Sequence, residues 1–242
     1  RLAVALESSS TAEARPTTLI EFLTSEADRV RSAAAAALGA IGGNPARAAL
    51  LARAETLATP CYLYAGSVLR TRAADLLGLK SVDRRFYALK ANPHPGILRA
   101  LAALGFGMEC VSLGELERVR EVLPELSPER VLFTPNFAPR AEYAEALARG
   151  VRVTVDNLSV LERWPALFAG HEILLRFDLG RGLGHHDKVK TGGEKSKFGI
   201  AAAEIDAAAR LASACGAQVV GLHAHLGSGI FDIAHWKSVY AD

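Results

Sequence analysis

Lys90 is the first residue whose position suggests chemistry, because it ends the otherwise apolar stretch 85–90. In an extended strand, Phe86, Ala88 and Lys90 would share one face. A lysine held there would lose part of its hydration, which favours the neutral amine that forms Schiff bases. The alternative is a lysine just past the strand, with its ammonium group in water. The pattern alone leaves both interpretations open.

A second group of reactive residue types lies in the stretch 221–229, which reads Gly-Leu-His-Ala-His-Leu-Gly-Ser-Gly. In a strand, His223 and His225 point to the same side. The turn at 227–229 offers backbone N–H groups and a hydroxyl to an anion such as phosphate. Two histidines at this spacing could instead bind a metal, or one could be a core residue beside an ordinary turn. The residues alone do not separate these three alternatives.

A third candidate is the polar stretch 185–199, which contains four lysines, two histidines and three glycines. A long polar loop after a strand is often a lid or a substrate clamp. The same charge density is also typical of a solvated surface.

Short apolar stretches alternate with amphipathic ones from residue 61 onward, which predicts βαβ units and a parallel sheet. Capping boxes are expected at Ser112 and Ser159, each with a glutamate three residues later. Helix ends are expected at Gly105, Gly150 and Gly216. The predicted strands are 85–90, 106–111, 131–134, 151–155, 173–178 and 218–225, with a further short strand at 60–64. The predicted helices are 95–104, 113–123, 139–149, 159–168 and 201–215.

The predicted strand ends recur at a constant interval, which indicates one strand and one helix per step. Five of them are spaced by 22 residues, and the sixth follows 47 residues later, after the polar loop. Six such units predict an α/β fold, either a TIM-type (β/α)8 barrel or a doubly wound sheet. Too few residues follow the sixth unit to complete a barrel of eight. The strand ends are Lys90, Ser112, Thr134, Asp156, Asp178 and His225.

The first quarter of the chain has a different texture. It is rich in Ala, Ser, Thr and Arg, with helical patterning at 17–38 and 45–57. We therefore expect a helical N-terminal extension or linker over 1–56 and a partial barrel domain over 57–242.

Composition limits the classes of partner. Lys and Arg total 28 against 26 Asp and Glu, and half of the residues are hydrophobic. This balance argues against nucleic acid and anionic membranes as partners. No apolar run reaches the ~20 residues of a membrane helix. The three cysteines, Cys61, Cys110 and Cys215, lack a metal-binding or paired spacing, so a cytoplasmic location is expected.

Four motifs in a fixed order make the sequence resemble a known family. They occupy 87–92 (Tyr-Ala-Leu-Lys-Ala-Asn), 111–117, 191–199 and 222–228. Together they resemble the pyridoxal-phosphate-dependent decarboxylases of the alanine racemase-like fold, and most closely the members that act on diaminopimelate. The resemblance covers roughly residues 58–242 and implies a (β/α)8 barrel with about six of its eight units present.

The resemblance implies roles for residues near the two ends of the predicted sheet. Lys90 corresponds to the lysine that holds pyridoxal 5′-phosphate as an internal aldimine. His225 corresponds to the histidine that stacks on the pyridine ring, and Ser228 to the serine that binds the phosphate. Gly227 and Gly229 would allow the backbone to approach that phosphate. No metal ion is implied.

Two more cofactor contacts are implied, at Glu109 and Arg176. Glu109 stands where the family often has aspartate, and Arg176 resembles the strand residue beneath the cofactor. Lys197 is the most family-like charge of the polar loop, which resembles the segment near the substrate and the dimer interface.

The implied reaction is decarboxylation of meso-diaminopimelate to L-lysine, the last step of lysine biosynthesis, by a cytoplasmic homodimer. The run at 185–188 favours this substrate by resemblance, and ornithine, arginine or carboxynorspermidine are the alternatives. A non-catalytic homologue that regulates a partner is the alternative class. The family's Glu-Pro-Gly-Arg segment, a later glycine-rich loop, a cysteine near the active site and a C-terminal β-domain are not found in the sequence. The chain is therefore expected to be a fragment that is inactive alone.

Overall fold

The structure is a computed structural model that describes residues 2–6, 61–178, 183–184, 198–225 and 227–228. The chain divides into two compact units, one formed by Arg1–Tyr87 with Asn92–Gly107 and the other by Ala88–Ala91 with Met108–Asp242. Lys90 therefore belongs to the second unit, although the residues on both sides of its segment belong to the first. The helices predicted at 17–38 and 45–57 lie outside the described residues, and the domain boundary at 56/57 stays a prediction.

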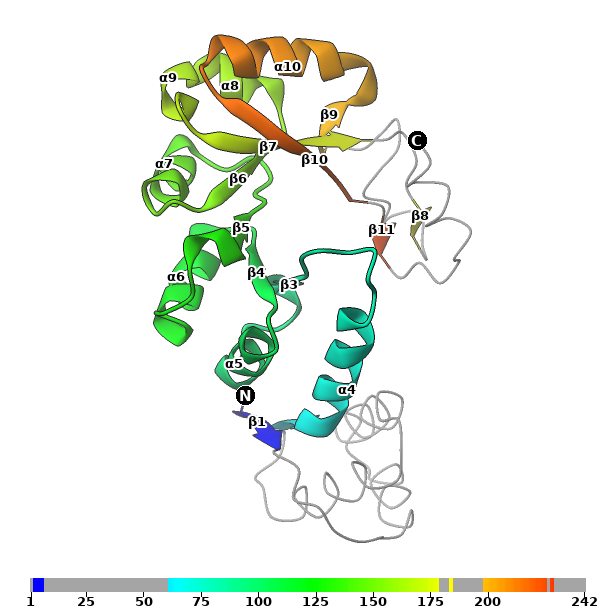
Figure 1. The fold of residues 1–242 in the computed structure, drawn as a ribbon. Helices are drawn as coiled ribbons and strands as arrows, with labels where there is room; N and C mark the ends of the chain where they lie inside the picture. Colours follow the sequence, from blue (N-terminus) through cyan, green and yellow to red (C-terminus); the bar gives the residue numbers. More distant parts are fainter. Residues whose placement is uncertain (1, 7–60, 179–182, 185–197, 226, 229–242) are drawn as a thin grey trace, which may run out of the picture. The chain divides into compact units, whose positions relative to one another are not determined.

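The described part of the first unit contains a pair of strands, two helices and the first residues of the main sheet (Figure 1). Strand β1 (Leu2–Leu6) pairs in parallel with β2 (Cys61–Ala65), which confirms the short strand predicted near 60–64. Helix α4 (Gly66–Leu77) follows β2 directly and was not predicted. Its buried side is small, since Ala73 is the residue of this helix that is buried. Helix α5 (Pro95–Ala103) agrees with the prediction.

The main sheet has the strand order β3-β4-β5-β6-β7-β10, with β9 pairing beside β7. Every described pair from β4 to β10 is parallel. The order follows the chain without reversal, which is the winding of a (β/α) barrel, whereas a doubly wound sheet reverses at a switch point. The six predicted strands are present, the first of them ending at Ala88 instead of Lys90. Their bounds are β3 (Phe86–Ala88), β4 (Gly107–Cys110), β5 (Val131–Phe133), β6 (Arg152–Val155), β7 (Glu172–Asp178) and β10 (Gln218–Ala224). The short strand β9 (Ile200–Ala201) was not predicted.

Helices of the second unit connect successive strands of the sheet (Figure 1). The predicted helix 159–168 is divided at Trp164, because the residue before Pro165 is driven out of the helical region. The predicted helix 201–215 begins as the 3-10 turn η4 (Ala202–Glu204). The remaining 3-10 turns are η1 (Leu89–Ala91) and η2 (Pro128–Arg130). The α-helices are α6 (Leu113–Val122), α7 (Arg140–Ala148), α8 (Leu158–Arg163), α9 (Pro165–Phe168) and α10 (Ile205–Ala214).

The helix caps agree with the sequence at one of the two predicted N-termini. Ser112 Oγ accepts a hydrogen bond from Glu115 N at 3.3 Å, so the cap of α6 is confirmed. The cap predicted at Ser159 is wrong. Asn157 caps α8 instead, because its Oδ1 accepts from Ser159 N at 2.9 Å and the helix begins at Leu158. The predicted helix ends are confirmed by positive φ angles at Gly105 (98°), Gly150 (70°) and Gly216 (72°).

The core of the second unit lies between the sheet and its helices. Tyr143 of α7 is fully buried, with its ring centroid 6.1 Å from that of Phe133 and 5.8 Å from that of Phe168. Cys110 of β4 and Cys215 after α10 are buried free thiols. Burial raises the pKa of the Cys110 thiol well above its usual range. None of the described helices is long and apolar enough to cross a membrane.

Candidate functional site

Polar residues follow the strands of the second unit at the carboxyl end of the sheet. The strands are parallel and run in register, so these residues lie along the same rim. Thr134 N, for example, donates to Cys110 O of the neighbouring strand at 2.8 Å. Ligands of parallel α/β folds bind at this rim, which makes it the candidate site. Its members are Lys90, Ser112, Thr134, Asp156, Asp178 and His225.

Lys90 lies just past the strand, which is the second of the two alternatives that the pattern left open, and not at the end of a strand 85–90. Strand β3 ends at Ala88, and Lys90 is the middle residue of the 3-10 turn η1. Leu89 is fully buried, whereas Lys90 is exposed. The predicted alternation of Phe86, Ala88 and Lys90 on one face therefore does not extend to Lys90, because the backbone turns before the lysine. The amine is carried just beyond the strand and is open to solvent.

Four of the residues implied by the resemblance act on one another electrostatically. Burial lowers the pKa of His225, and the positive charges of Lys90 and Arg176 lower it further. The carboxylate of Glu109 opposes this shift. Lys90, Glu109 and Arg176 therefore all influence the charge of His225, and together with burial they favour a neutral imidazole.

Arg176 is the most buried charge of this group, with 7% of its surface exposed. Burial lowers its pKa, and the carboxylates of Asp156, Asp178 and Glu109 oppose that shift. A guanidinium is charged at any physiological pH, so Arg176 provides a fixed cation at the rim.

Two contacts orient the Arg176 side chain, and sequence analysis identified neither of them. Its Nη1 donates to Asn136 Oδ1, and its Cζ lies 5.3 Å from the centroid of the Phe198 ring. Glu109 is oriented similarly, because its Oε1 accepts a hydrogen bond from Thr134 Oγ1. The two residues of each hydrogen bond are far apart in the chain, by 25 positions for Thr134 and Glu109 and by 40 for Arg176 and Asn136. A single sequence carries little signal for such pairs.

His223 lies beside Arg176 and carries an unusual polar atom. Its Nδ1 is buried without a hydrogen-bond partner in the described part of the chain. Burial, followed by the charges of Arg176, His225 and Lys90, lowers its pKa to about 4. A buried polar atom without a partner is costly to the folded state.

The glycine–serine turn is described only in part. Strand β11 (Gly227–Ser228) pairs in parallel with β8 (Leu183–Gly184). The structure gives the backbone of these residues, and Gly229, like the loop residues 185–197, lies outside the described residues. The predicted phosphate contacts of Gly227, Ser228 and Gly229 stay predictions.

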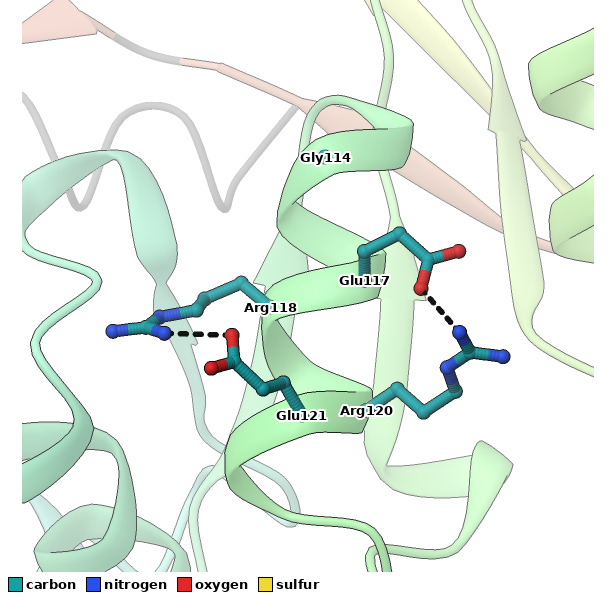
Figure 2. A pocket seen from close by; sticks show the side chains of 5 residues that line it. All are labelled: Gly114, Glu117, Arg118, Arg120 and Glu121. Atoms are coloured by element: carbon teal, nitrogen blue, oxygen red, sulfur yellow. Dashed lines mark hydrogen bonds and ion pairs between the residues drawn. The ribbon is translucent and has the colours of Figure 1, made fainter.

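A surface pocket on α6 does not form part of the site. Figure 2 shows that it is lined by residues of this one helix. Arg118 pairs with Glu121 at 2.7 Å, and Arg120 pairs with Glu117 at 2.8 Å. Its charged groups are thus already matched by neighbours of opposite sign, as is usual for exposed helix pairs.

The described residues contain no group of three or more His, Cys, Asp or Glu side chains placed to hold a metal ion. The paired histidines of β10 therefore have no third ligand within the described ranges, and the metal-site interpretation gains no support there.

Comparison with known proteins identifies the family. Residues 71–241 match the model of the pyridoxal-binding domain of pyridoxal-dependent decarboxylases. The chain belongs to this family. The match covers the whole main sheet, so the cofactor implied for the rim is pyridoxal phosphate.

Individual relatives agree with this assignment. The chain is 40% identical over 148 residues to diaminopimelate decarboxylase of Methanothermobacter thermautotrophicus, covering 61% of this chain and 34% of the relative. It is 33% identical over 195 residues to that of Deinococcus radiodurans, covering 81% of this chain and 50% of the relative. The chain thus spans between a third and half of the length of these curated relatives.

A solved structure shows the same fold. The crystal structure of Helicobacter pylori diaminopimelate decarboxylase in complex with L-lysine superposes with a TM-score of 0.67 at 26% identity. The superposition covers 78% of this chain and 52% of the other.

The residues at the rim fit pyridoxal phosphate. Two cations, Lys90 and Arg176, both act electrostatically on His225, and positive charge in this region suits an anionic phosphate ester. His225 is favoured in its neutral form, and its flat ring can stack on an aromatic cofactor. The charge and the ring therefore agree with this cofactor.

Proposed function

We propose that the complete protein uses pyridoxal phosphate to remove a carboxylate from meso-diaminopimelate, which yields L-lysine. The observation that carries this proposal is the family match over residues 71–241 together with the 33–40% identity to relatives named diaminopimelate decarboxylase. Bound pyridoxal phosphate supplies a conjugated system that accepts the electron pair left by the departing carboxylate.

Lys90 and His225 would have different roles in the reaction. Lys90 would form the covalent bond to the cofactor, and its exposed turn leaves the amine accessible to an incoming substrate. His225 would hold the plane of the cofactor ring by stacking. Fixing this plane keeps the scissile bond perpendicular to the ring, which is an orientation effect.

The remaining residues would hold the cofactor in place. Gly227, Ser228 and Gly229 would bind its phosphate through backbone N–H groups and a hydroxyl. Arg176 would add a fixed positive charge beneath the ring. Glu109, oriented by Thr134, would balance part of that charge.

We also propose that the complete protein is a cytoplasmic homodimer with an amino acid as its substrate. A sedimentation measurement of the full-length protein tests the dimer, and fractionation of cells tests the location.

The function is tested by carbon dioxide release from full-length protein supplied with pyridoxal phosphate. The substrates to compare are meso-diaminopimelate, L-ornithine and L-arginine. We expect meso-diaminopimelate to give the highest kcat/KM. A preference for ornithine or arginine would overturn the substrate assignment, and cofactor binding without release from any of them would favour a non-catalytic homologue.

A further inference from the structure

One loop, which contacts Glu109 through Thr134 and Arg176 through Asn136, contains an unusual backbone conformation. It follows β5 and comprises residues 134–138, called here the β5 loop. Phe137 in this loop has φ of 54°, and among the described residues it is the one non-glycine residue with positive φ. A bulky residue in the left-handed region is strained, and such strain persists only where the surroundings impose it.

Asp156 supplies the constraint from the neighbouring strand. Its carboxylate is 1% exposed, and Oδ2 accepts a hydrogen bond from Phe137 N at 3.3 Å. The other oxygen, Oδ1, accepts from the hydroxyl of Tyr143 at 3.4 Å. One buried carboxylate thus binds the backbone of the β5 loop and is itself held by a core tyrosine.

Two neighbouring residues of the β5 loop are linked to Arg176 by contacts. Asn136, next to Phe137, accepts the hydrogen bond from Arg176 Nη1. The ring of Phe137 lies 6.0 Å from that of Phe198, centroid to centroid, and Phe198 is the ring beneath the guanidinium. Asn136 therefore contacts Arg176 directly, and Phe137 contacts Phe198, which in turn contacts Arg176.

We propose that Asp156 is a positioning residue for Arg176, acting through the β5 loop rather than through contact with the cofactor. Its hydrogen bond to the Phe137 amide fixes the loop, which places Asn136 and Phe198 against the guanidinium. The inference rests on the proposed function, because it takes Arg176 to be part of the cofactor pocket.

The test is a double-mutant cycle read out as the Kd of pyridoxal phosphate, titrated by absorbance on the full-length protein. The variants are Asp156→Ala, Asn136→Ala and the two together. Each single variant should weaken binding roughly tenfold, the usual effect of losing a hydrogen bond to a charged group. The double variant should bind within about twofold of the Asn136 single variant, because both changes disrupt the same support.

Two further variants separate positioning from stability. Asn157→Ala removes the cap of α8 at the residue after Asp156, so it should lower the free energy of unfolding and leave the Kd unchanged. Asp156→Asn keeps an acceptor of the same shape, and it should retain the Kd within roughly threefold.

Asp156 is buried, so Asp156→Ala could fail to fold, and a variant at an exposed residue of the β5 loop provides an independent test. Phe137 is 54% exposed, so Phe137→Ala should fold normally and still weaken cofactor binding severalfold, because Phe198 loses its neighbour. Leu79→Ala, at a residue that is 50% exposed, is the matched control and should leave the Kd unchanged.

Each outcome bears on the inference. Losses that multiply in the double variant, wild-type affinity in Phe137→Ala, or equal losses in Asp156→Asn and Asp156→Ala would overturn it. Absence of pyridoxal phosphate binding by the wild-type protein would overturn the proposed function and this inference with it. Normal wild-type binding with multiplying losses would overturn the inference alone.

Discussion

His223 lies directly opposite Arg176 in the parallel register of β10 and β7. Burial and the neighbouring cations lower the pKa of His223 from 6.5 to about 4. The unfolded chain therefore takes up a proton at higher pH than the folded protein. The stability that a neutral His223 contributes is present above pH 6.5 and is lost as the pH falls towards 4.

This linkage predicts a measurable acid sensitivity. Between pH 7 and pH 5, the wild-type protein should lose about 2 kcal/mol more of its free energy of unfolding than His223→Gln, which cannot be protonated. Urea unfolding of both proteins at the two pH values measures the difference. Parallel losses in the two proteins would show that His223 is not the group responsible.

Replacing Lys90 should separate covalent from non-covalent cofactor binding. Lys90→Ala should leave no cofactor bonded to the protein after borohydride reduction, as read by intact mass, and nearly all turnover should be lost. Lys80→Ala, at another exposed lysine, is the control and should retain both. An adduct of unchanged yield in Lys90→Ala would show that another amine forms the bond.

His225→Ala should give a different result from Lys90→Ala. Because stacking orients the ring without bonding to it, the covalent adduct should remain while kcat falls by up to about a hundredfold. The measurement is the adduct mass together with the rate of carbon dioxide release. Loss of the adduct in His225→Ala would contradict a role limited to orientation.

Gly199 fixes the start of β9 against the end of β7. Its φ is 85°, and a Cβ there would lie 2.8 Å from Asp178 N and 3.0 Å from the carbonyl carbon of Phe177. Gly199→Ala should therefore lower the free energy of unfolding by about 2 kcal/mol or more.

The matched control for this variant is Gly105→Ala. Gly105 has φ of 98°, but a Cβ there would meet nothing within 4 Å. The control carries only the backbone strain, about 1 kcal/mol. Urea unfolding compares the two variants, and equal losses would mean that the contact with β7 contributes nothing.

The caps of α6 and α8 provide a paired test of side-chain capping. Ser112→Ala should lower the free energy of unfolding by about 1 kcal/mol, because Ser112 caps α6. Ser159→Ala should change it little, since Asn157 is the residue that caps α8. Thermal or urea unfolding of both variants checks this, and a larger loss at Ser159 would favour the original sequence-based assignment.

The strands could be predicted because buried parallel strands are apolar runs at a constant spacing. The N-terminus of α8 could not be chosen with the same certainty, since Asn157 and Ser159 are equally good capping residues two positions apart. Helix α4 escaped prediction because Ala73 is its buried residue, which leaves little apolar periodicity to detect.

The site was predictable where it depends on local sequence and not where it depends on contacts across the sheet. Lys90 and His225 lie at strand ends within recognisable motifs. The hydrogen bond from Arg176 to Asn136 connects residues 40 positions apart, and no local sequence pattern near either residue predicts it. The early end of β3 was missed for a related reason, because the alternation of side chains continues in the sequence after the strand itself has ended.

The buried thiols of Cys110 and Cys215 can report local unfolding of the second unit. Both thiols are buried, Cys110 on β4 and Cys215 directly after α10, where its Sγ donates to Leu161 O at 3.5 Å. A thiol-specific reagent can reach them only when the surrounding structure opens, and the raised pKa of Cys110 further suppresses its reactive thiolate while the protein is folded. The labelling rate at each cysteine, resolved by mass spectrometry, would therefore time the opening of strand and helix separately, without any engineered probe.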